Sequence, residues 1–186
     1  MPAHLFVISA PSGAGKTSLI SALLKQLPGL GVSVSHTTRP MRPGEAEGVN
    51  YHFVDVPTFE RMVETGDFLE HARVFDNLYG TSRNSVDSAL AAGRDVVLEI
   101  DWQGARRIRA LYPDAVTVFI APPSIAALRA RLEARGQDAP EVIDRRMRAA
   151  EDEMSHAPEY QHLVVNDDFG SALEALVGII QATRQH

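Results

Sequence analysis

A glycine-rich loop near the N-terminus constrains the fold of this chain more than any other feature. The loop, residues 10–17, reads APSGAGKT; it follows the apolar run 5–8 and leads into an apolar helical pattern. A strand that turns through such a loop into a helix presents successive backbone N–H groups that bind phosphate. The spacing predicts a phosphate-binding P-loop, in which Lys16 reaches the β- and γ-phosphates and the Thr17 hydroxyl holds Mg²⁺.

The loop departs from the strict P-loop pattern at one residue, and it does not match the other common phosphate-binding motif. The strict P-loop pattern has glycine where Ala10 stands, and alanine fits there if its φ angle is negative. The loop lacks the G-x-G-x-x-G spacing of a dinucleotide-binding turn. A glycine-rich strand-to-helix turn with an incidental lysine is the competing interpretation.

Length and composition describe an ordinary globular chain. The 186 residues are 45% apolar and 23% charged, which favours one domain with a sizeable core. The absence of cysteine excludes disulfides, thiolate zinc sites and a cysteine nucleophile. No apolar stretch approaches the ~20 residues of a membrane span, and the N-terminus lacks the charged flank of a signal peptide. We therefore expect a cytoplasmic protein.

The net charge of −6 is unevenly distributed along the chain. Residues 1–44 contain no acidic residue and sum to +4, 45–101 to −8, 102–150 to +4 and 151–186 to −6. An acidic protein with two positive segments is not expected to bind a polyanion such as nucleic acid. The pattern favours a compact anionic ligand held between the two positive segments.

Strand and helix patterns alternate over most of the chain. Short apolar runs at 5–8, 96–98, 116–120 and 163–165 are typical of strands buried in a parallel sheet. Helical patterns fall at 17–27, 85–92, 103–111, 124–135 and 140–156. A last helix carries Leu173, Leu176, Val177 and Ile180 on one face, with Ser171 as the expected N-cap. This alternation predicts βαβ units and an α/β fold.

Residues 33–85 break the alternation and predict an inserted subdomain. The segment opens with prolines and glycines, continues with a strand-like stretch at 50–54 and contains a short helix at 57–64. Beyond it, Glu99 and Asp101 close the strand near Val96. Both carboxylates are expected on one side of that strand, at the sheet edge where nucleotides bind and where Mg²⁺ waters could be held.

Several motifs resemble guanylate kinase in order and spacing, from about Leu5 to Asp168. The most distinctive is S-x-T-T-R-x-x-R-x-G-E at residues 35–45. The others, besides the P-loop, are 49–51 (VNY), 68–70 (FLE), 79–81 (YGT), 99–104 (EIDWQG), 119–124 (FIAPPS) and 164–167 (VVND).

The resemblance implies a fold and its parts. We expect an α/β, three-layer P-loop kinase fold with a parallel central sheet, an inserted mixed α/β GMP-binding subdomain and a helical lid. The whole chain, 1–186, would be a single domain. Its core would comprise 1–32, 86–126 and 158–186, its GMP-binding subdomain 33–85 and its lid 127–157.

The resemblance also implies which residues bind GMP. The substrate-binding set is Ser35, Arg39, Arg42, Tyr51, Glu70, Tyr79, Thr81 and Asp101. The two arginines and two tyrosines match phosphate contacts, for which bidentate guanidinium groups are suited. Glu70 matches the residue that reads guanine, since a carboxylate accepts from N1–H and the exocyclic amine. The hydroxyls of Ser35 and Thr81 match base contacts, and Asp101 would serve both the base and the metal shell.

The ATP side is implied in the same way. The ATP-binding set is Ser12, Gly13, Ala14, Gly15, Lys16, Thr17, Ser18 and Asn166, with Asn166 on the adenine side. The groups expected to act in catalysis are Lys16, Arg39, Arg131, Arg135 and Arg146, the last three closing over the ATP phosphates. Thr17 and Asp101 would hold Mg²⁺, largely through water. For each lid arginine, a solvated helix face is the competing interpretation, because arginine is the usual base in this chain.

The function implied is ATP:GMP phosphotransfer, in which Mg²⁺ is the cofactor, ATP the co-substrate and GMP or dGMP the acceptor. No side-chain base is needed, because the GMP phosphate is already a dianion near neutral pH. The expected role is GMP recycling in purine metabolism, with no nucleic-acid or membrane partner and no predicted homo-oligomer.

Three alternatives to this function are each disfavoured by features of the sequence. A kinase of another phosphorylated substrate, such as a ribose bisphosphate, would not need Ser35, Glu70 and Thr81. A non-catalytic scaffold typically has a degraded P-loop, whereas Gly15, Lys16 and Thr17 are intact. A GTPase switch would need an N-K-x-D motif, which is absent.

Overall fold

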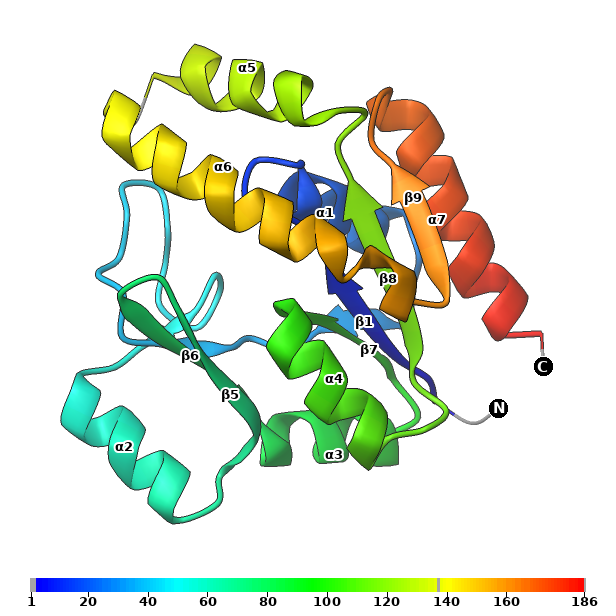
Figure 1. Ribbon diagram of the computed structural model, residues 1–186. Helices are drawn as coiled ribbons and strands as arrows, with labels where there is room; N and C mark the ends of the chain where they lie inside the picture. Colours follow the sequence, from blue (N-terminus) through cyan, green and yellow to red (C-terminus); the bar gives the residue numbers. More distant parts are fainter. Residues whose placement is uncertain (1–2, 137, 186) are drawn as a thin grey trace. The chain divides into compact units, whose positions relative to one another are not determined.

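The structure is a computed structural model that describes residues 3–136 and 138–185 (Figure 1). Two compact units are present, unit 1 made of Met1–Val7 and Gly29–Ala115, and unit 2 made of Ile8–Pro28 and Val116–His186. The boundary passes through strand β1 (Leu5–Ser9), so each unit contains part of the parallel central sheet. These two units do not coincide with the core, insert and lid that the resemblance implies, and that three-part division stays a prediction.

Unit 1 holds the strands β2 (Leu30–Val32) and β7 (Asp95–Glu99) beside β1, in the order β2-β7-β1. β2 and β7 run parallel, and the Val96 N–H donates to the His4 carbonyl at 3.0 Å. The three central residues of β7 are at most 3% exposed, as expected for a strand covered on both faces. Helix α3 (Arg83–Ala91) packs against β7.

A second sheet in unit 1 occupies the predicted insert. Its strands are β3 (His36–Thr37), β4 (His52–Phe53), β5 (Phe68–Val74) and β6 (Asn77–Ser82), in the order β4-β3-β6-β5. β3 pairs in parallel with β4, whereas β6 pairs antiparallel with β3 and β5. Helices α2 (Val56–Glu64) and α4 (Trp102–Leu111) both pack against β5. The insert is therefore mixed α/β, as expected.

Unit 2 continues the parallel sheet in the order β1-β8-β9, with β8 (Val116–Ala121) parallel to β9 (His162–Val165). Helix α7 (Phe169–Thr183) runs beside β9 and packs against α1 (Lys16–Gln26) (Figure 1).

Helices α5 (Ile125–Arg135) and α6 (Pro140–Ser155) form a pair in unit 2, followed by the single turn η1 (Ala157–Glu159). Gly136, with φ 63°, ends α5, and Pro140 begins α6. The pair is held together by a buried apolar cluster of Leu128, Leu132, Ile143, Met147 and Ala150.

The predicted fold class is confirmed, with two local corrections. The strand β7 ends at Glu99, and Asp101 lies beyond it as the N-cap of α4, so the two carboxylates do not share one strand. Helix α7 is capped by Asp168 and not by Ser171, whose backbone N–H donates to the Asp168 carboxylate at 2.8 Å. Among the described residues, no helix has both the length and the apolar character needed to cross a membrane.

Candidate active site

The P-loop of unit 2 has the backbone conformation that its sequence predicts. Gly13 and Gly15 have φ angles of 89° and 90°, a region that side chains disfavour. Phe75 is the single non-glycine with a positive φ among residues 3–136 and 138–185, so alanine fits at Ala10. Gly15 is the N-cap of α1 and supplies no capping side chain, which leaves this helix N-terminus suited to an anion.

Helix α5 packs closely on the P-loop. A Cβ atom on Gly13 would lie 2.8 Å from Cδ2 of Leu132 and 3.1 Å from Cδ1 of Leu128. Gly13 is thus required by space as well as by its φ angle. The contact connects the phosphate-binding loop to the apolar cluster between α5 and α6.

Asn166, directly after β9, also contacts the P-loop. Its side chain is buried, and its amide Nδ2 donates to the Ala14 carbonyl at 2.7 Å. The backbone carbonyl of Asn166 accepts from the Arg131 guanidinium at 2.8 Å. The residue expected on the adenine side therefore has its amide donor bonded to the P-loop backbone.

The other two predicted lid arginines share one carboxylate. Asp138 accepts from Arg135 at 3.0 Å and lies 3.3 Å from Nη1 of Arg146. The same Arg146 nitrogen lies 3.4 Å from the Ser12 hydroxyl in the P-loop. Arg146 thus contacts both Asp138 and the P-loop residue Ser12, and Arg131 contacts Asn166, which is bonded to the P-loop. Arg135 contacts Asp138. Sequence reasoning did not single out Asp138, and one acidic residue in a charged helix pair gives little signal.

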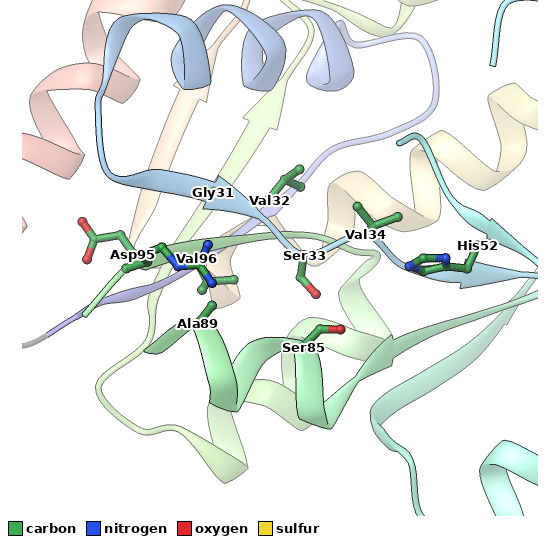
Figure 2. A pocket seen from close by; sticks show the side chains of 10 residues that line it. Gly31, Val32, Ser33, Val34, His52, Ser85, Ala89, Asp95 and Val96 are labelled. Atoms are coloured by element: carbon green, nitrogen blue, oxygen red, sulfur yellow. The ribbon is translucent and has the colours of Figure 1, made fainter. Parts of the chain in front are cut away.

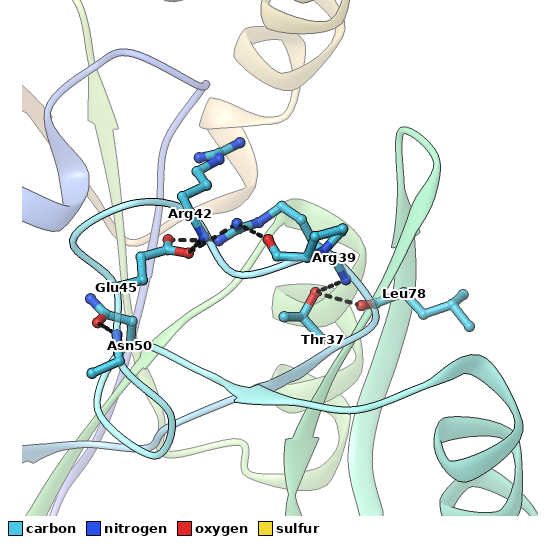
Figure 3. A network of polar contacts seen from close by, with 8 residues as sticks. Thr37, Arg39, Arg42, Glu45, Asn50 and Leu78 are labelled. Atoms are coloured by element: carbon cyan, nitrogen blue, oxygen red, sulfur yellow. Dashed lines mark hydrogen bonds and ion pairs between the residues drawn. The ribbon is translucent and has the colours of Figure 1, made fainter.

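In unit 1, the first predicted phosphate arginine is buried against a carboxylate (Figure 3). Arg39 is 8% exposed, and its two terminal nitrogens donate to the two Glu45 oxygens at 3.0 and 2.7 Å. Burial opposes the charge on Arg39, but the bonds to Glu45 outweigh it and raise the pKa of the guanidinium. Glu45 also accepts from the backbone N–H of Arg42 at 2.8 Å, while the Arg42 side chain is exposed.

The two predicted phosphate tyrosines lie beside Arg39. The rings of Tyr51 and Tyr79 are 5.9 Å apart, edge to face, and the Arg39 guanidinium lies 5.4 Å from the Tyr51 ring centre. Burial, followed by the charge of Glu99, raises the pKa of Tyr51 to about 12. The Tyr51 hydroxyl therefore keeps its proton and stays a hydrogen-bond donor at physiological pH.

Glu70, the predicted guanine reader, is a buried carboxylate on β5. It is 3% exposed and accepts a 2.5 Å hydrogen bond from the Thr81 hydroxyl, directly opposite on β6. Burial raises the pKa of Glu70 to about 7; the Thr81 bond and Arg107 oppose this shift, and the charge of Asp101 adds to it. A buried carboxylate with one short bond has lone pairs left for a ligand that donates hydrogen bonds.

Helix α4 forms the wall behind Glu70. Gly104 faces the carboxylate so closely that a Cβ there would lie 2.9 Å from Cδ of Glu70. Arg107, one turn further on, donates to the Leu69 carbonyl at 3.1 Å. Asp101 caps the helix, with one oxygen accepting from the Gly104 N–H and the other from Gln103, both at 3.0 Å.

The predicted GMP residues thus form two groups in unit 1. One surrounds Arg39 with Tyr51 and Tyr79, and the other surrounds Glu70 with Thr81 and Asp101. Strand β6 carries a member of each group. Of the remaining predicted residues, Ser35 is buried and its carbonyl accepts from the His52 N–H at 2.9 Å, and Arg42 extends into solvent. Sequence reasoning missed the roles of Glu45 and Gly104, although both stand within motifs of the resemblance.

A separate cavity in unit 1 lies between β2 and α3 (Figure 2). Ser33 and Ser85 line it, and the buried Ser33 hydroxyl has no hydrogen-bond partner among the described residues. The lining contains none of the predicted site residues. This cavity therefore does not bear on the site assignment.

The fold and the site together define a P-loop kinase. A glycine-rich loop joins a buried parallel strand to a helix, and the predicted insert carries a buried arginine, a buried carboxylate and two partly buried tyrosines that suit a phosphorylated acceptor. This class transfers a phosphoryl group from a bound nucleotide.

Comparison with known proteins identifies the family. The family model described as Guanylate kinase matches residues 3–183. A guanylate kinase of Chromohalobacter salexigens is 62% identical over 180 residues, covering 97% of this chain and 84% of the relative. One of Alkalilimnicola ehrlichii is 60% identical over 184 residues, covering 99% and 91%. The chain belongs to the guanylate kinase family, as the sequence motifs predicted, and is a nucleotide-binding kinase.

Solved structures agree with this assignment. The crystal structure of guanylate kinase from Anaplasma phagocytophilum superimposes with a TM-score of 0.82 at 34% identity, over 97% of this chain and 85% of that one. A gluconokinase from Sinorhizobium meliloti 1021 is 18% identical with a TM-score of 0.53, over 99% of this chain and 95% of that one, and shares the fold alone.

Proposed function

We propose that this chain transfers the γ-phosphoryl group of ATP to GMP, binding GMP with residues of unit 1 and ATP with residues of unit 2. The observation that carries the acceptor assignment is the buried Glu70 carboxylate held by Thr81. Guanine donates from N1–H and from its exocyclic amine, and a carboxylate accepts both. Adenine instead presents an acceptor at N1, so it would leave Glu70 opposed by a lone pair. Such a site can reject the wrong base by ~10⁴–10⁵.

Arg39, Arg42, Tyr51 and Tyr79 bind the GMP phosphate in this proposal. Glu45 holds the Arg39 fork in place through two hydrogen bonds, and the Tyr51 hydroxyl, whose pKa is raised to about 12, adds a neutral donor. The exposed side chain of Arg42 is available to reach the phosphate. Tyr79 and Thr81 are two residues apart on β6, so they share a face about 7 Å apart. This spacing suits a nucleotide whose phosphate and base are read by one strand, with Ser35 and Asp101 as further base contacts.

The P-loop residues Ser12–Ser18 bind the ATP phosphates at the N-terminus of α1. Lys16 supplies the positive charge at the transferring group, and Arg131, Arg135 and Arg146 add charge from α5 and α6. Asn166 also belongs to the ATP-binding residues in this proposal. The segment 127–157, which carries these three arginines, acts as the lid, 33–85 is the GMP-binding subdomain, and 1–32, 86–126 and 158–186 form the core.

Mg²⁺ is the implied cofactor, and the donor types fit it. Thr17 offers a hydroxyl and Asp101 a carboxylate, the hard oxygen ligands that Mg²⁺ prefers. Across residues 3–136 and 138–185, no cluster of three or more histidine, cysteine or acidic side chains could cage a metal. A cation bound mainly by water and substrate phosphates matches this sparse set. When bound, Mg²⁺ neutralises charge on the ATP phosphates.

The transfer needs no side-chain base. An oxygen of the GMP phosphate forms a bond to the γ-phosphorus while the bond from that phosphorus to the bridging oxygen of ADP breaks. The products are GDP and ADP, and the same groups serve the reverse reaction. The protein contributes alignment and charge stabilisation. We place the reaction in the cytoplasm, in purine nucleotide metabolism and GMP recycling, with dGMP as a second acceptor.

One assay tests the proposal. ADP release is measured with Mg-ATP and, in turn, GMP, dGMP, AMP, UMP and a ribose bisphosphate. We expect turnover with GMP and dGMP and at least ~10⁴-fold lower kcat/KM with AMP. Turnover with the ribose bisphosphate but not with GMP would assign another phosphorylated acceptor and overturn the proposal.

A further inference from the structure

Asn166 bonds to three parts of unit 2 at once. Its backbone N–H donates to the Ala121 carbonyl at the end of β8, at 2.8 Å. Its backbone carbonyl accepts from Nη2 of Arg131 in α5, and its side-chain Nδ2 donates to the Ala14 carbonyl in the P-loop. The side chain is well buried, since the residue is 6% exposed.

The bond to Ala14 meets a need of the P-loop. Ala14 is fully buried, so its carbonyl has little access to water and requires a protein donor. The neighbouring Gly15 lies directly against the same amide, and a Cβ at this position would lie only 2.5 Å from Nδ2 of Asn166. Gly15 in turn begins α1, where the phosphate-binding N–H groups lie.

We propose that Asn166 is a positioning residue for the ATP triphosphate. Its side chain fixes the Ala14–Gly15 turn and thus the start of α1, while its backbone carbonyl fixes Arg131 of the lid. One buried residue therefore sets both the P-loop and an arginine expected on the same phosphates. This inference rests on the proposed function, because it takes the P-loop ligand to be a triphosphate.

The role is distinct from contact with adenine. One N–H of the Asn166 amide is bonded to Ala14, whereas a base contact would use its second N–H or its side-chain oxygen, so the two roles are separated by their dependence on the base. A base contact affects the choice among nucleoside triphosphates. A positioning role instead weakens all of them equally, together with a triphosphate that has no base.

Two variants separate these roles. N166A removes the donor, and N166D keeps the volume but opposes a carboxylate to the Ala14 carbonyl. Binding of Mg-tripolyphosphate is measured by calorimetry, and kcat/KM is measured with ATP, CTP and UTP. We expect both variants to bind tripolyphosphate about 10- to 100-fold more weakly, with kcat/KM reduced by a similar factor for every donor. The preference for ATP over CTP and UTP stays unchanged.

The neighbouring exposed residue provides the control. D167N changes a charge next to Asn166 on the surface, and we expect wild-type values. Melting temperature and GMP affinity show whether each variant is folded, and N166D decides the question if N166A is not. Tripolyphosphate affinity within twofold of wild type in N166D would overturn the inference, as would loss of the ATP preference alone. Failure of the proposed function is read separately, as a wild-type enzyme that does not phosphorylate GMP.

Discussion

At the residue scale, Glu70 is a carboxylate whose burial serves recognition at a cost in stability. Burial raises its pKa from 4.5 to about 7, so the folded protein holds this proton more tightly than the unfolded chain does. The unfolded carboxyl ionises near pH 4.5 and the folded one near pH 7. The contribution of Glu70 to the free energy of unfolding therefore falls as the pH rises through this interval, by about 3 kcal/mol in all, and does not change further above it.

The variant E70Q tests this cost. Glutamine can still accept from Thr81 but has no charge to desolvate. We expect its melting temperature, relative to that of wild type, to be higher at pH 8 than at pH 5, as measured by circular dichroism. At both pH values the variant should bind GMP at least tenfold more weakly, because the glutamine NH2 group would oppose one of the two guanine donors. An equal change in melting temperature at pH 5 and pH 8 would contradict the argument.

The same titration predicts how GMP binding depends on pH. Guanine needs the ionised carboxylate, so protonation of free Glu70 competes with binding below pH 7. We expect wild-type affinity, measured by calorimetry between pH 5.5 and 8.5, to fall by up to tenfold per pH unit below about pH 7. The second ionisation of the GMP phosphate, near pH ~6, affects wild type and E70Q alike. Parallel pH profiles for the two proteins would exclude Glu70 as the titrating group.

At the element scale, α4 supports the guanine site from behind, and one glycine makes this possible. A Cβ on Gly104 would lie 2.9 Å from Cδ of Glu70, so G104A should displace the carboxylate. Overpacking of this kind costs about 1–3 kcal/mol, and we expect GMP affinity to fall by a corresponding 5- to 150-fold. Binding of Mg-ATP, which rests on unit 2, should not change. Calorimetry with each ligand makes the measurement.

Helix α7 offers a matched control for G104A. A Cβ on Gly178 would have no atom of residues 3–136 or 138–185 within 4 Å, apart from those of its own helix backbone, so G178A adds a methyl group without crowding a described neighbour. We expect unchanged GMP affinity and a stability gain of up to ~1 kcal/mol. Equal GMP affinity in G104A and G178A would show that α4 does not set the position of Glu70.

The elements also show how far the sequence could predict the structure. Apolar runs predicted β1, β7, β8 and β9, and the first three of these are buried along most of their length. They did not predict β2, which has only three residues, one of them glycine. The hairpin of β5 and β6 was not predicted. Its turn contains no glycine, and the positive φ of 53° falls on Phe75, a residue type that rarely adopts such an angle. The N-cap of α7 was predicted at the wrong residue because Asp168 and Ser171 are both common capping residues. In the structure Asp168 is the cap, and it accepts hydrogen bonds from Ser171.

The sequence predicted which residues form the site, but it did not predict which side chains contact one another. The motifs pointed to Glu70 and Arg39, but nothing in the spacing showed that Thr81 would bond the first or Glu45 the second. Both pairs depend on tertiary packing: Thr81 faces Glu70 through the register of two strands, and Glu45 reaches Arg39 across a loop. Likewise, Gly104 and Asn166 owe their importance to neighbours distant in the sequence.

At the scale of the whole molecule, the acidic chain places its predicted phosphate-binding groups in two units. The +4 charge of residues 1–44 includes Lys16 of unit 2 and Arg39 of unit 1, and the second positive segment includes the lid arginines of unit 2. A protein organised in this way should bind each substrate with its own unit. Damage to one set of groups should then abolish transfer without abolishing binding of the other substrate.

The variant K16A tests this independence. Lys16 begins α1 in unit 2, whereas all the predicted GMP residues belong to unit 1. Without its charge at the transferring phosphoryl group, we expect kcat to fall by at least 10²–10³-fold, on the order found when a single charge-stabilising donor is removed. The dissociation constant for GMP, measured by calorimetry, should stay within twofold of wild type. The chain has one other lysine, the exposed Lys25 near the end of the same helix, and K25A should retain the wild-type rate. A K16A enzyme with near-normal kcat would remove the P-loop assignment, and one that loses GMP binding would show that the two units do not bind their substrates independently.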